Sequence, residues 1–381
     1  MDGIIFLIIF IAVVAIQRKL YNRLIPEKVE YRCAFSVSDA HEGDEIQMLE
    51  WVCNRMFLPV PWLKVDIHTS SWLDYAQSMS VVAQNSRTVT SIHTLKGRQR
   101  VTRHWRLKCL KRGVYTTRNV TLIWGDILGI SLGSVPVSVN MRLTVYPEVL
   151  NIEEMFIPVN YLQGDTIVKR WIIDDPFIIS GTREYTSRDP MNRIHWKATA
   201  RENRLMVRKN DFTSQLSLTV ILNIQSEEYE YCDVVDRDKI ELGIKVAATI
   251  MDRALRMSLP VRFGTNGCTL DESDKMVFTR TGSGKAHISE LLTILAKLEL
   301  KNVRDFEDFM KGIDKELEGD EVIIVTSYAN RAICDILRKL IIQGNRIKLV
   351  VLDYYSENRD LPGEIDVYYL SGVDFKNAGI A

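Results

Sequence analysis

The sequence lacks the patterns that mark several common protein classes. Its 381 residues hold only six cysteines, and no two of them form a Cys-x-x-Cys pair, which argues against a disulfide scaffold and a zinc ribbon. The six histidines include no His-Glu-x-x-His spacing, so a zincin metalloprotease is also disfavoured. No apolar run is long enough, or repeated often enough, for a polytopic membrane protein. We therefore expect no cofactor or metal, and no catalytic residue.

A net charge of one sign is also missing, because 49 Lys and Arg balance 49 Asp and Glu. The balance hides two unlike halves. Residues 1–212 contain 28 basic and 21 acidic residues, and residues 213–381 contain 21 basic and 28 acidic residues. Such asymmetry predicts separate units with separate contacts.

The N-terminus carries an uninterrupted apolar stretch from Gly3 to Ile16, followed by Arg18 and Lys19. A bilayer core needs about 20 helical residues, and basic side chains at its edge can extend a short helix towards the interface. We therefore predict a membrane anchor helix over residues 1–24. The basic flank predicts a single-pass protein of the cell membrane with a cytoplasmic body, for which the membrane is one partner.

Residues 25–150 alternate between short apolar–polar runs and turn residues, which predicts an antiparallel β-sandwich-like domain. No Asp or Glu occurs between Asp74 and Asp126. This segment contains a predicted basic patch: Arg98, Arg100, Arg103, Arg106, Lys108, Lys111 and Arg112. Alternating positions in a strand share one face, so Arg98, Arg100 and Arg106 are expected on the same side.

The basic patch has three interpretations. It could bind anionic lipid or an acidic protein surface, or be a solvated sheet face paired with carboxylates elsewhere. Binding to nucleic acid is the weakest interpretation, because no stacking aromatic pattern accompanies the charges.

Residues 151–212 form a predicted connector with a distinctive frame. Its members are Gly181, Arg183, Glu184, Tyr185, Asp189, Arg193, Ile194, Trp196, Lys197, Ala200, Arg201, Leu205 and Val207. This frame resembles the domain-of-unknown-function-58 family, whose members share Arg-Glu-Tyr and Arg-Ile-Asp-Trp-Lys elements at these spacings. The sequence departs from that pattern at Arg188, where the family has Gly, and at His195, where it has Asp.

The residues of the frame allow three roles. Arg side chains could clamp the sandwich to the next domain through carboxylates, or the frame could be a docking surface. The third role is an enzyme site that uses Arg183, Asp189 and Arg193. The resemblance itself implies association with a MoxR-type AAA+ ATPase.

Residues 213–381 alternate between buried strands and amphipathic helices, which predicts an α/β domain with a parallel sheet. The order resembles a von Willebrand factor A domain. Many such domains bind a divalent cation through Asp-x-Ser-x-Ser and a later Thr. Here the matching positions are Asn223, Gln225, Glu227 and Thr326, so the metal site is expected to be degenerate.

The prediction is thus an α+β multidomain protein that acts as a non-catalytic, membrane-anchored adaptor or scaffold on the cytoplasmic face. By resemblance, its partners are a MoxR-type AAA+ ATPase and client proteins, in the assembly or maturation of protein complexes. The alternatives are a basic-patch binder of anionic lipid or nucleic acid, and an uncharacterised enzyme.

Overall fold

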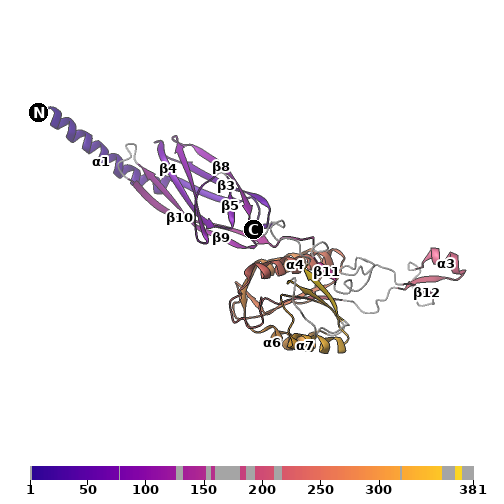
Figure 1. Cartoon of the computed structure of the whole chain (residues 1–381). Coiled ribbons are helices and arrows are strands. Elements are labelled where there is room, and N and C mark those ends of the chain that lie inside the picture. The colour runs from indigo at the N-terminus through magenta and orange to yellow at the C-terminus, as the bar shows by residue number, and fades with distance from the viewer. Residues whose placement is uncertain are drawn as a thin grey trace. The chain divides into compact units, whose positions relative to one another are not determined.

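The chain divides into two compact units, Met1–Glu148 and Val149–Ala381 (Figure 1). The structure is a computed structural model that describes residues 2–76, 78–125, 132–151, 156–158, 181–185, 194–209, 217–317, 320–353 and 365–370. Each unit is described by itself.

The first unit consists of one helix and ten strands. The helix α1 spans Asp2–Lys28. The strands are β1 (Val29–Phe35), β2 (Asp39–His41), β3 (Glu45–Asn54), β4 (Val60–Ser70), β5 (Leu73–Tyr75), β6 (Met79–Ala83), β7 (Ser86–Leu95), β8 (Arg100–Cys109), β9 (Gly113–Gly125) and β10 (Leu132–Tyr146). They form a four-stranded sheet, β1-β3-β8-β5, and a six-stranded sheet, β2-β10-β9-β4-β7-β6.

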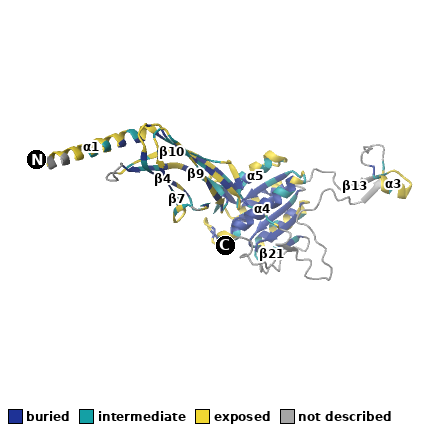
Figure 2. Ribbon diagram, turned by 90° about the horizontal axis from the view of Figure 1, so that it is seen from above, coloured by how far each residue is buried: buried dark blue, intermediate teal, exposed yellow. Residues whose placement is uncertain are grey.

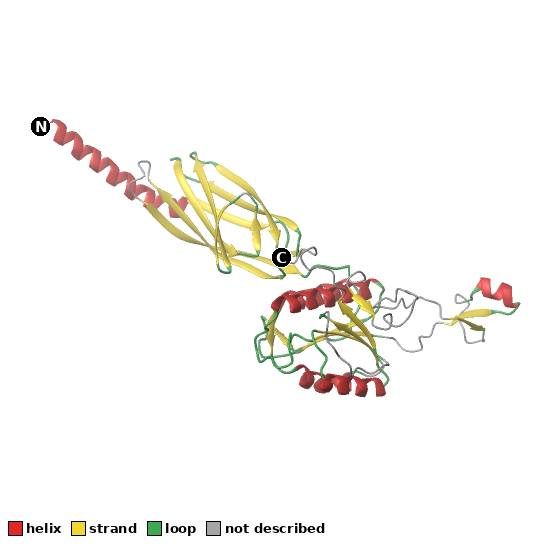
Figure 3. Cartoon of the chain, in the orientation of Figure 1, coloured by secondary structure: helices red, strands yellow, loops and turns green. Residues whose placement is uncertain are grey.

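The two sheets of the first unit share one hydrophobic core (Figure 3). Strand β3 shows the reason, since Ile46, Met48, Glu50 and Val52 are buried while the residues that alternate with them are more exposed. That period of two places every second side chain in the core. Most strand pairs are antiparallel, but β2 pairs with β10 in parallel, so the six-stranded sheet is mixed.

The predicted membrane anchor is wrong. Of the helices in the described ranges, none combines the length and the apolar content that a bilayer crossing needs. The apolar run stops at Ile16, and two apolar residues that follow it in α1 pack into the core of the β-domain. Ile25 is fully buried, and Leu24 packs against the same core. This finding overturns the predicted single-pass location in the cell membrane. Residues nearer the N-terminus, such as Ile4 and Ile16, are exposed (Figure 2).

The second unit begins with small elements and continues with an α/β arrangement. Its strands are β11 (Phe156–Pro158), β12 (Gly181–Glu184), β13 (Met206–Lys209), β14 (Leu218–Leu222), β15 (Val261–Thr265), β16 (Gly267–Thr269), β17 (Val277–Phe278), β18 (Leu298–Asn302), β19 (Glu321–Thr326), β20 (Arg346–Val351) and β21 (Asp366–Leu370). Its helices are α3 (Trp196–Glu202), α4 (Arg237–Arg256), α5 (Lys285–Lys297), α6 (Phe306–Ile313), the 3-10 turn η3 (Asp314–Glu316) and α7 (Arg331–Ile342).

The main sheet of the second unit has the order β11-β21-β20-β19-β14-β15-β17. Helix α4 covers one face, and α6 and α7 cover the other (Figures 1 and 3). Close packing of α4 depends on Gly243, because a Cβ there would lie 2.8 Å from Leu352 Cδ1 and 3.1 Å from Leu222 Cδ1. Fourteen residues of α4 are buried, which makes it the central helix of this unit (Figure 2).

The predicted fold class is therefore wrong in two respects besides the anchor. The first unit is not purely antiparallel, since β2 and β10 run in parallel. The second unit is not purely parallel, because the five parallel strands of its sheet are flanked by antiparallel β11 and β17. The protein has a β-rich N-terminal unit and mixed sheets. Sequence alternation reports burial, but it does not fix the direction of short edge strands.

Candidate functional site

The frame of the connector folds into a small strand pair with a helix between its strands. Strand β12 pairs antiparallel with β13, so that Gly181 lies opposite Lys209 and Glu184 opposite Met206. Helix α3 begins after His195, whose Nδ1 accepts a hydrogen bond from the Ala198 N–H at 3.1 Å. Aspartate is a common residue at such a position, so His195 replaces it as the helix cap.

The side chains of the frame are largely exposed where the structure describes them. Trp196 is 70% exposed, and Lys197, Ala200 and Arg201 are also exposed. Tyr185 is half-buried, and its N–H donates to the Leu205 carbonyl at 2.8 Å. Asp189 and Arg193 lie outside the described residues, and so does the side chain of Arg183. The enzyme hypothesis for these three residues thus stays a prediction.

The degenerate metal positions meet at the carboxyl ends of β14 and β19. The Asn223 Nδ2 donates to Thr326 Oγ1 at 3.1 Å, and the Gln225 N–H donates to Asn223 Oδ1 at 3.0 Å. The Thr326 hydroxyl in turn donates to the Tyr328 carbonyl at 2.7 Å. All three side chains are buried. Their oxygens are engaged in holding the loops, which leaves them poorly placed to bind a cation.

Gln225 joins this network to the neighbouring loops. Its Oε1 accepts hydrogen bonds from the Phe306 N–H at 2.8 Å and from Asn266 Nδ2 at 3.2 Å. The first of these satisfies a backbone donor at the start of α6, where helical N–H groups lack intrahelical partners. Glu227 is exposed and takes no part in the network. Within the described ranges, no group of three or more His, Cys, Asp or Glu is placed to hold a metal ion.

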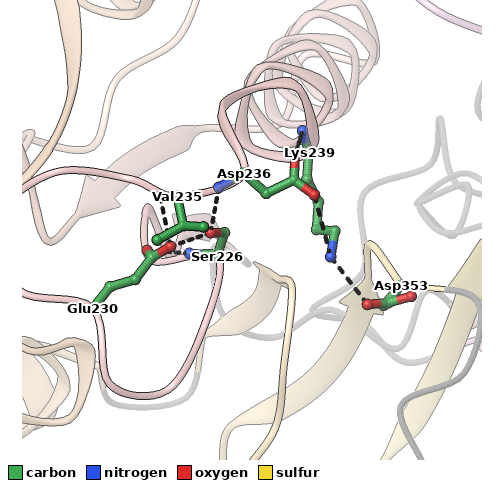
Figure 4. A network of polar contacts seen from close by, with 6 residues as sticks. All are labelled: Ser226, Glu230, Val235, Asp236, Lys239 and Asp353. Atoms are coloured by element: carbon green, nitrogen blue, oxygen red, sulfur yellow. Dashed lines mark hydrogen bonds and ion pairs between the residues drawn. The ribbon is translucent and has the colours of Figure 1, made fainter.

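A second cluster fixes the loop that follows Gln225 (Figure 4). Glu230 accepts hydrogen bonds from the N–H groups of Ser226 at 2.7 Å and Val235 at 2.8 Å, and from the Ser226 hydroxyl. Asp236 then caps α4 by accepting from the Lys239 N–H at 3.0 Å. The ammonium of Lys239 lies 3.0 Å from Asp353 Oδ2, beyond the end of β20. Glu230 was not predicted, because it lies outside the spacing of the metal motif. Its carboxylate accepts the hydrogen bonds that hold this loop.

A hollow of about 560 Å³ opens beside these loops. Four carboxylates and two very exposed tyrosines line it, at Glu228, Asp305, Glu307, Asp335, Tyr229 and Tyr231. Burial raises the pKa of Tyr328 in its wall to about 12, and the charges of Glu307, Glu228 and Asp305 add to this rise. Arg331 also lines the hollow and Asp335 is paired with Arg338, but the carboxylates outnumber these cations, so the formal charge around the hollow is negative. We name the four carboxylates the acidic edge.

The basic patch lies in the first unit and is divided between two sides of β8. Arg98, Arg100, Arg106 and Lys108 are exposed, whereas Arg103 points to the other side and contacts Trp105. Arg100 and Arg106 share one side of β8, as expected from strand parity, but Arg98 lies in the turn before β8, 3.7 Å from the ring centre of Phe57. Arg112 is buried, and Lys111 lies 5.0 Å from the ring centre of Trp72. The patch is thus not one continuous surface.

A buried polar cluster in the first unit was not predicted. Glu50 is fully buried and accepts from the Ser91 hydroxyl at 2.6 Å and from Trp105 Nε1 at 2.9 Å. The His93 Nε2 lies 3.4 Å from Glu50 and 3.0 Å from Ser91. Burial would raise the pKa of Glu50, but hydrogen bonds from His93, Ser91 and Trp105 outweigh it and hold that pKa below its usual value.

The three residue types resemble a nucleophile triad, but the geometry does not. Ser91 and Glu50 approach the same imidazole nitrogen, so the carboxylate cannot orient the ring for proton transfer from the hydroxyl. All three side chains are enclosed in the core. The Gly-x-Ser-x-Gly spacing also occurs at residues 129–133, of which 129–131 lie outside the described residues.

Comparison with protein families gives one match. Residues 181–368 match the family described as "Protein of unknown function DUF58". The chain contains a DUF58 domain. The domain begins with the frame at Gly181, includes the acidic edge, and ends in β21. A search of curated proteins finds no match.

Solved structures resemble parts of the chain only faintly. A non-cellulosomal cohesin from Archaeoglobus fulgidus has 15% identity and a TM-score of 0.21, over 33% of this chain and 94% of that one. The CARDB domain of the PF1109 protein from Pyrococcus furiosus has 13% identity and a TM-score of 0.21, over 32% and 97%. The sporulation control protein Spo0M from Bacillus subtilis has 12% identity and a TM-score of 0.18, over 30% and 49%. Such scores assign no function to the DUF58 domain.

Proposed function

We propose that this protein is a non-catalytic adaptor whose DUF58 domain binds other proteins through the loops at the carboxyl ends of its parallel strands. The proposal rests on the hydrogen bonds of Asn223, Gln225 and Thr326, whose polar groups hold the loops together. Loops fixed in this way present a preformed surface, which lowers the entropic cost of binding a partner. Open α/β sheets commonly bind at this edge.

The surface beside these loops suits a protein partner. Tyr229 and Tyr231 are 80% and 79% exposed, and they stand next to the carboxylates of the acidic edge. Tyrosine is enriched in protein interfaces because its ring is apolar and its hydroxyl is polar. We further propose that the unit is von Willebrand factor A-like, which its parallel β14, β15, β19 and β20 and its helices on both faces support.

The proposed partner is a MoxR-type AAA+ ATPase, acting with the adaptor in the assembly or maturation of protein complexes. The experiment is to measure binding of the full chain to a purified MoxR-type ATPase from the same cell by interferometry. We expect the double variant Tyr229→Ala/Tyr231→Ala to weaken binding by about tenfold or more, as loss of interface aromatic residues usually does.

The matched control is Ile342→Ala, which removes an equally exposed apolar side chain at the far end of α7. This variant should bind the ATPase like the original protein. Equal binding by the tyrosine variant and the control would reject the proposed surface. Absence of binding by the original chain would reject the ATPase as the partner.

A further inference from the structure

Several cations of the first unit lie on the outward side of its four-stranded sheet. Residues paired across neighbouring strands point to the same side, and three pairings define the set. Arg32 lies opposite Trp51, Gln47 opposite Arg106, and Glu45 opposite Lys108. We call the exposed cations of this side the basic face: Arg32, Arg100, Arg106 and Lys108.

Within the described ranges, the Arg and Lys side chains of the basic face form no ion pair, although Glu45 and Asp74 lie opposite Lys108 on the neighbouring strands. Among the residues that the structure describes, no carboxylate lies within ion-pair distance of Arg32, Arg100, Arg106 or Lys108. Three other cations of the same unit are paired. Arg55 lies 2.8 Å from Glu30, Lys64 2.8 Å from Asp66, and Arg87 2.7 Å from Asp74. This contrast argues against the interpretation in which the basic patch is an internally paired, solvated surface.

The chemistry of the basic face favours a polypeptide over a phosphate backbone. Leu49 and Trp51 are half-buried between its cations, and they add apolar area to the charged surface. Arginine and tryptophan together are typical of protein interface centres.

The chain itself contains a surface of the opposite charge. Residues 1–148 have 18 Lys and Arg against 12 Asp and Glu, a formal charge of +6, whereas residues 149–381 have 31 against 37, a charge of −6. The acidic edge concentrates carboxylates and exposed tyrosines around a hollow. Net neutrality of a whole protein also favours self-association.

We infer that the basic face of one chain binds the acidic edge of a second copy of the chain. The two surfaces are different, so the contact is heterologous and each bound copy leaves one surface free. Such contacts add further copies in a head-to-tail row unless the rotation closes a ring. This inference goes beyond the proposed binding of an ATPase, although both use the acidic edge, and the two would compete.

The test is sedimentation of the full chain over concentrations from about 1 to 100 µM. In about 50 mM salt, we expect the sedimentation coefficient to rise with concentration. In about 1 M salt it should return to the value of the monomer, because the Debye length falls to about 3 Å. Association that persists or grows in high salt would overturn the inference and point to apolar contacts of α1.

Charge reversal identifies the surfaces. Arg100→Glu/Arg106→Glu should weaken association by about tenfold or more, as should Glu228→Lys/Asp335→Lys. An equimolar mixture of these two variants should associate again, because the reversed surfaces attract each other. The control is Arg118→Glu/Arg142→Glu, which makes the same charge change at exposed positions on β9 and β10 of the other sheet.

Three results would overturn the inference. One is a monomer at every concentration, and another is equal weakening by the control. The third is a chain that stays monomeric but binds a single-stranded oligonucleotide, or vesicles containing phosphatidylserine, through Arg100 and Arg106. This third result would assign the basic face to a polyanion. The ATPase proposal is tested separately through Tyr229 and Tyr231, which these variants leave in place.

Discussion

Each unit of the protein contains a buried polar cluster, and the two clusters differ in charge and in position. In the first unit, a carboxylate, Glu50, joins strands of both sheets inside the core. In the second unit, neutral amides and a hydroxyl join loops at one end of the sheet, next to a hollow. Both clusters are fully enclosed, so burial alone does not separate a structural cluster from one that supports a binding surface. The position of a cluster relative to the open surface does separate the two kinds.

The difference in charge predicts the largest effect. Glu50→Ala would leave the Trp105 N–H and the Ser91 hydroxyl without their acceptor and would create a cavity between the sheets. Breaking a buried charged cluster costs about 3–5 kcal/mol. We expect the free energy of unfolding of the first unit to fall by that amount. Urea titration followed by tryptophan fluorescence can measure this, because five of the seven tryptophans precede residue 149.

The control for this prediction is Glu50→Gln, which keeps the side-chain volume and one carbonyl acceptor. It should cost less than Glu50→Ala. Far-ultraviolet dichroism of the helices, most of which belong to the second unit, should change little in either variant. A cost below about 1 kcal/mol for Glu50→Ala would mean that the cluster is not important for stability.

The amide cluster gives the second largest effect. Gln225→Leu removes the acceptor of the Phe306 N–H and of Asn266 Nδ2 while keeping a similar volume. An unpaired buried donor costs about 1–3 kcal/mol, and we expect a loss of that size in the second unit. The readout is urea unfolding followed by helix dichroism. The affinity for the ATPase should fall as well, because the cluster holds the loops that form the binding surface. A variant of unchanged stability that binds the ATPase normally would contradict this link.

The sequence predicted more of the local pattern than of the tertiary contacts. The alternating burial of β8, and the strand–helix order after Leu218, follow from the period of apolar residues. The Glu50 cluster could not be predicted, because its members come from β3, β7 and β8 and meet only in the folded sandwich. The anchor was wrong for a different reason, since the apolar run of α1 ends at Ile16 and the helix is not apolar enough over the length of a bilayer crossing.

The candidate site follows the same rule. The resemblance to a von Willebrand factor A domain singled out Asn223, Gln225 and Thr326, and the structure brings these residues together at the carboxyl ends of β14 and β19. Their hydrogen bonds to Asn266, Phe306 and Tyr328 could not be inferred, because those partners come from loops without a sequence signature. The acidic edge was missed because its carboxylates are scattered between residues 228 and 335.

Acid should affect the stability of the two units differently, because only the first cluster contains a carboxylate. The pKa of Glu50 is lower in the folded protein than in the unfolded chain, so its contribution to stability is complete above the ordinary carboxyl pKa of about 4.3. That contribution is lost as the pH falls through the lowered value, when the folded state must also take up a proton. We expect the first unit to lose stability below about pH 4.3. Unfolding by urea at a series of acidic pH values should show a shallower slope for Glu50→Gln.

The smallest effect concerns the ion pair between Lys239 and Asp353, which links the start of α4 to the end of β20. Burial would lower the pKa of Lys239, but the hydrogen bond that it donates to Asp353 and the charges of Asp353 and Asp236 raise that pKa overall. A raised lysine pKa stabilises the folded state below the ordinary value of about 10.4. The stabilisation is lost as the pH rises through the pKa of Lys239 in the folded protein. The effect of Lys239 therefore appears at alkaline pH, whereas the effect of Glu50 appears at acidic pH.

Because Asp353 is 47% exposed, solvent screens this pair, and Asp353→Asn should cost only about 0.5 kcal/mol at neutral pH. Helix dichroism in urea would measure the cost, and salt near 1 M should reduce it. The control is Asp335→Asn, which alters an exposed pair within α7 and does not join two elements. A cost above about 2 kcal/mol would show that this tether, and not the amide cluster, is the main polar support of the loops.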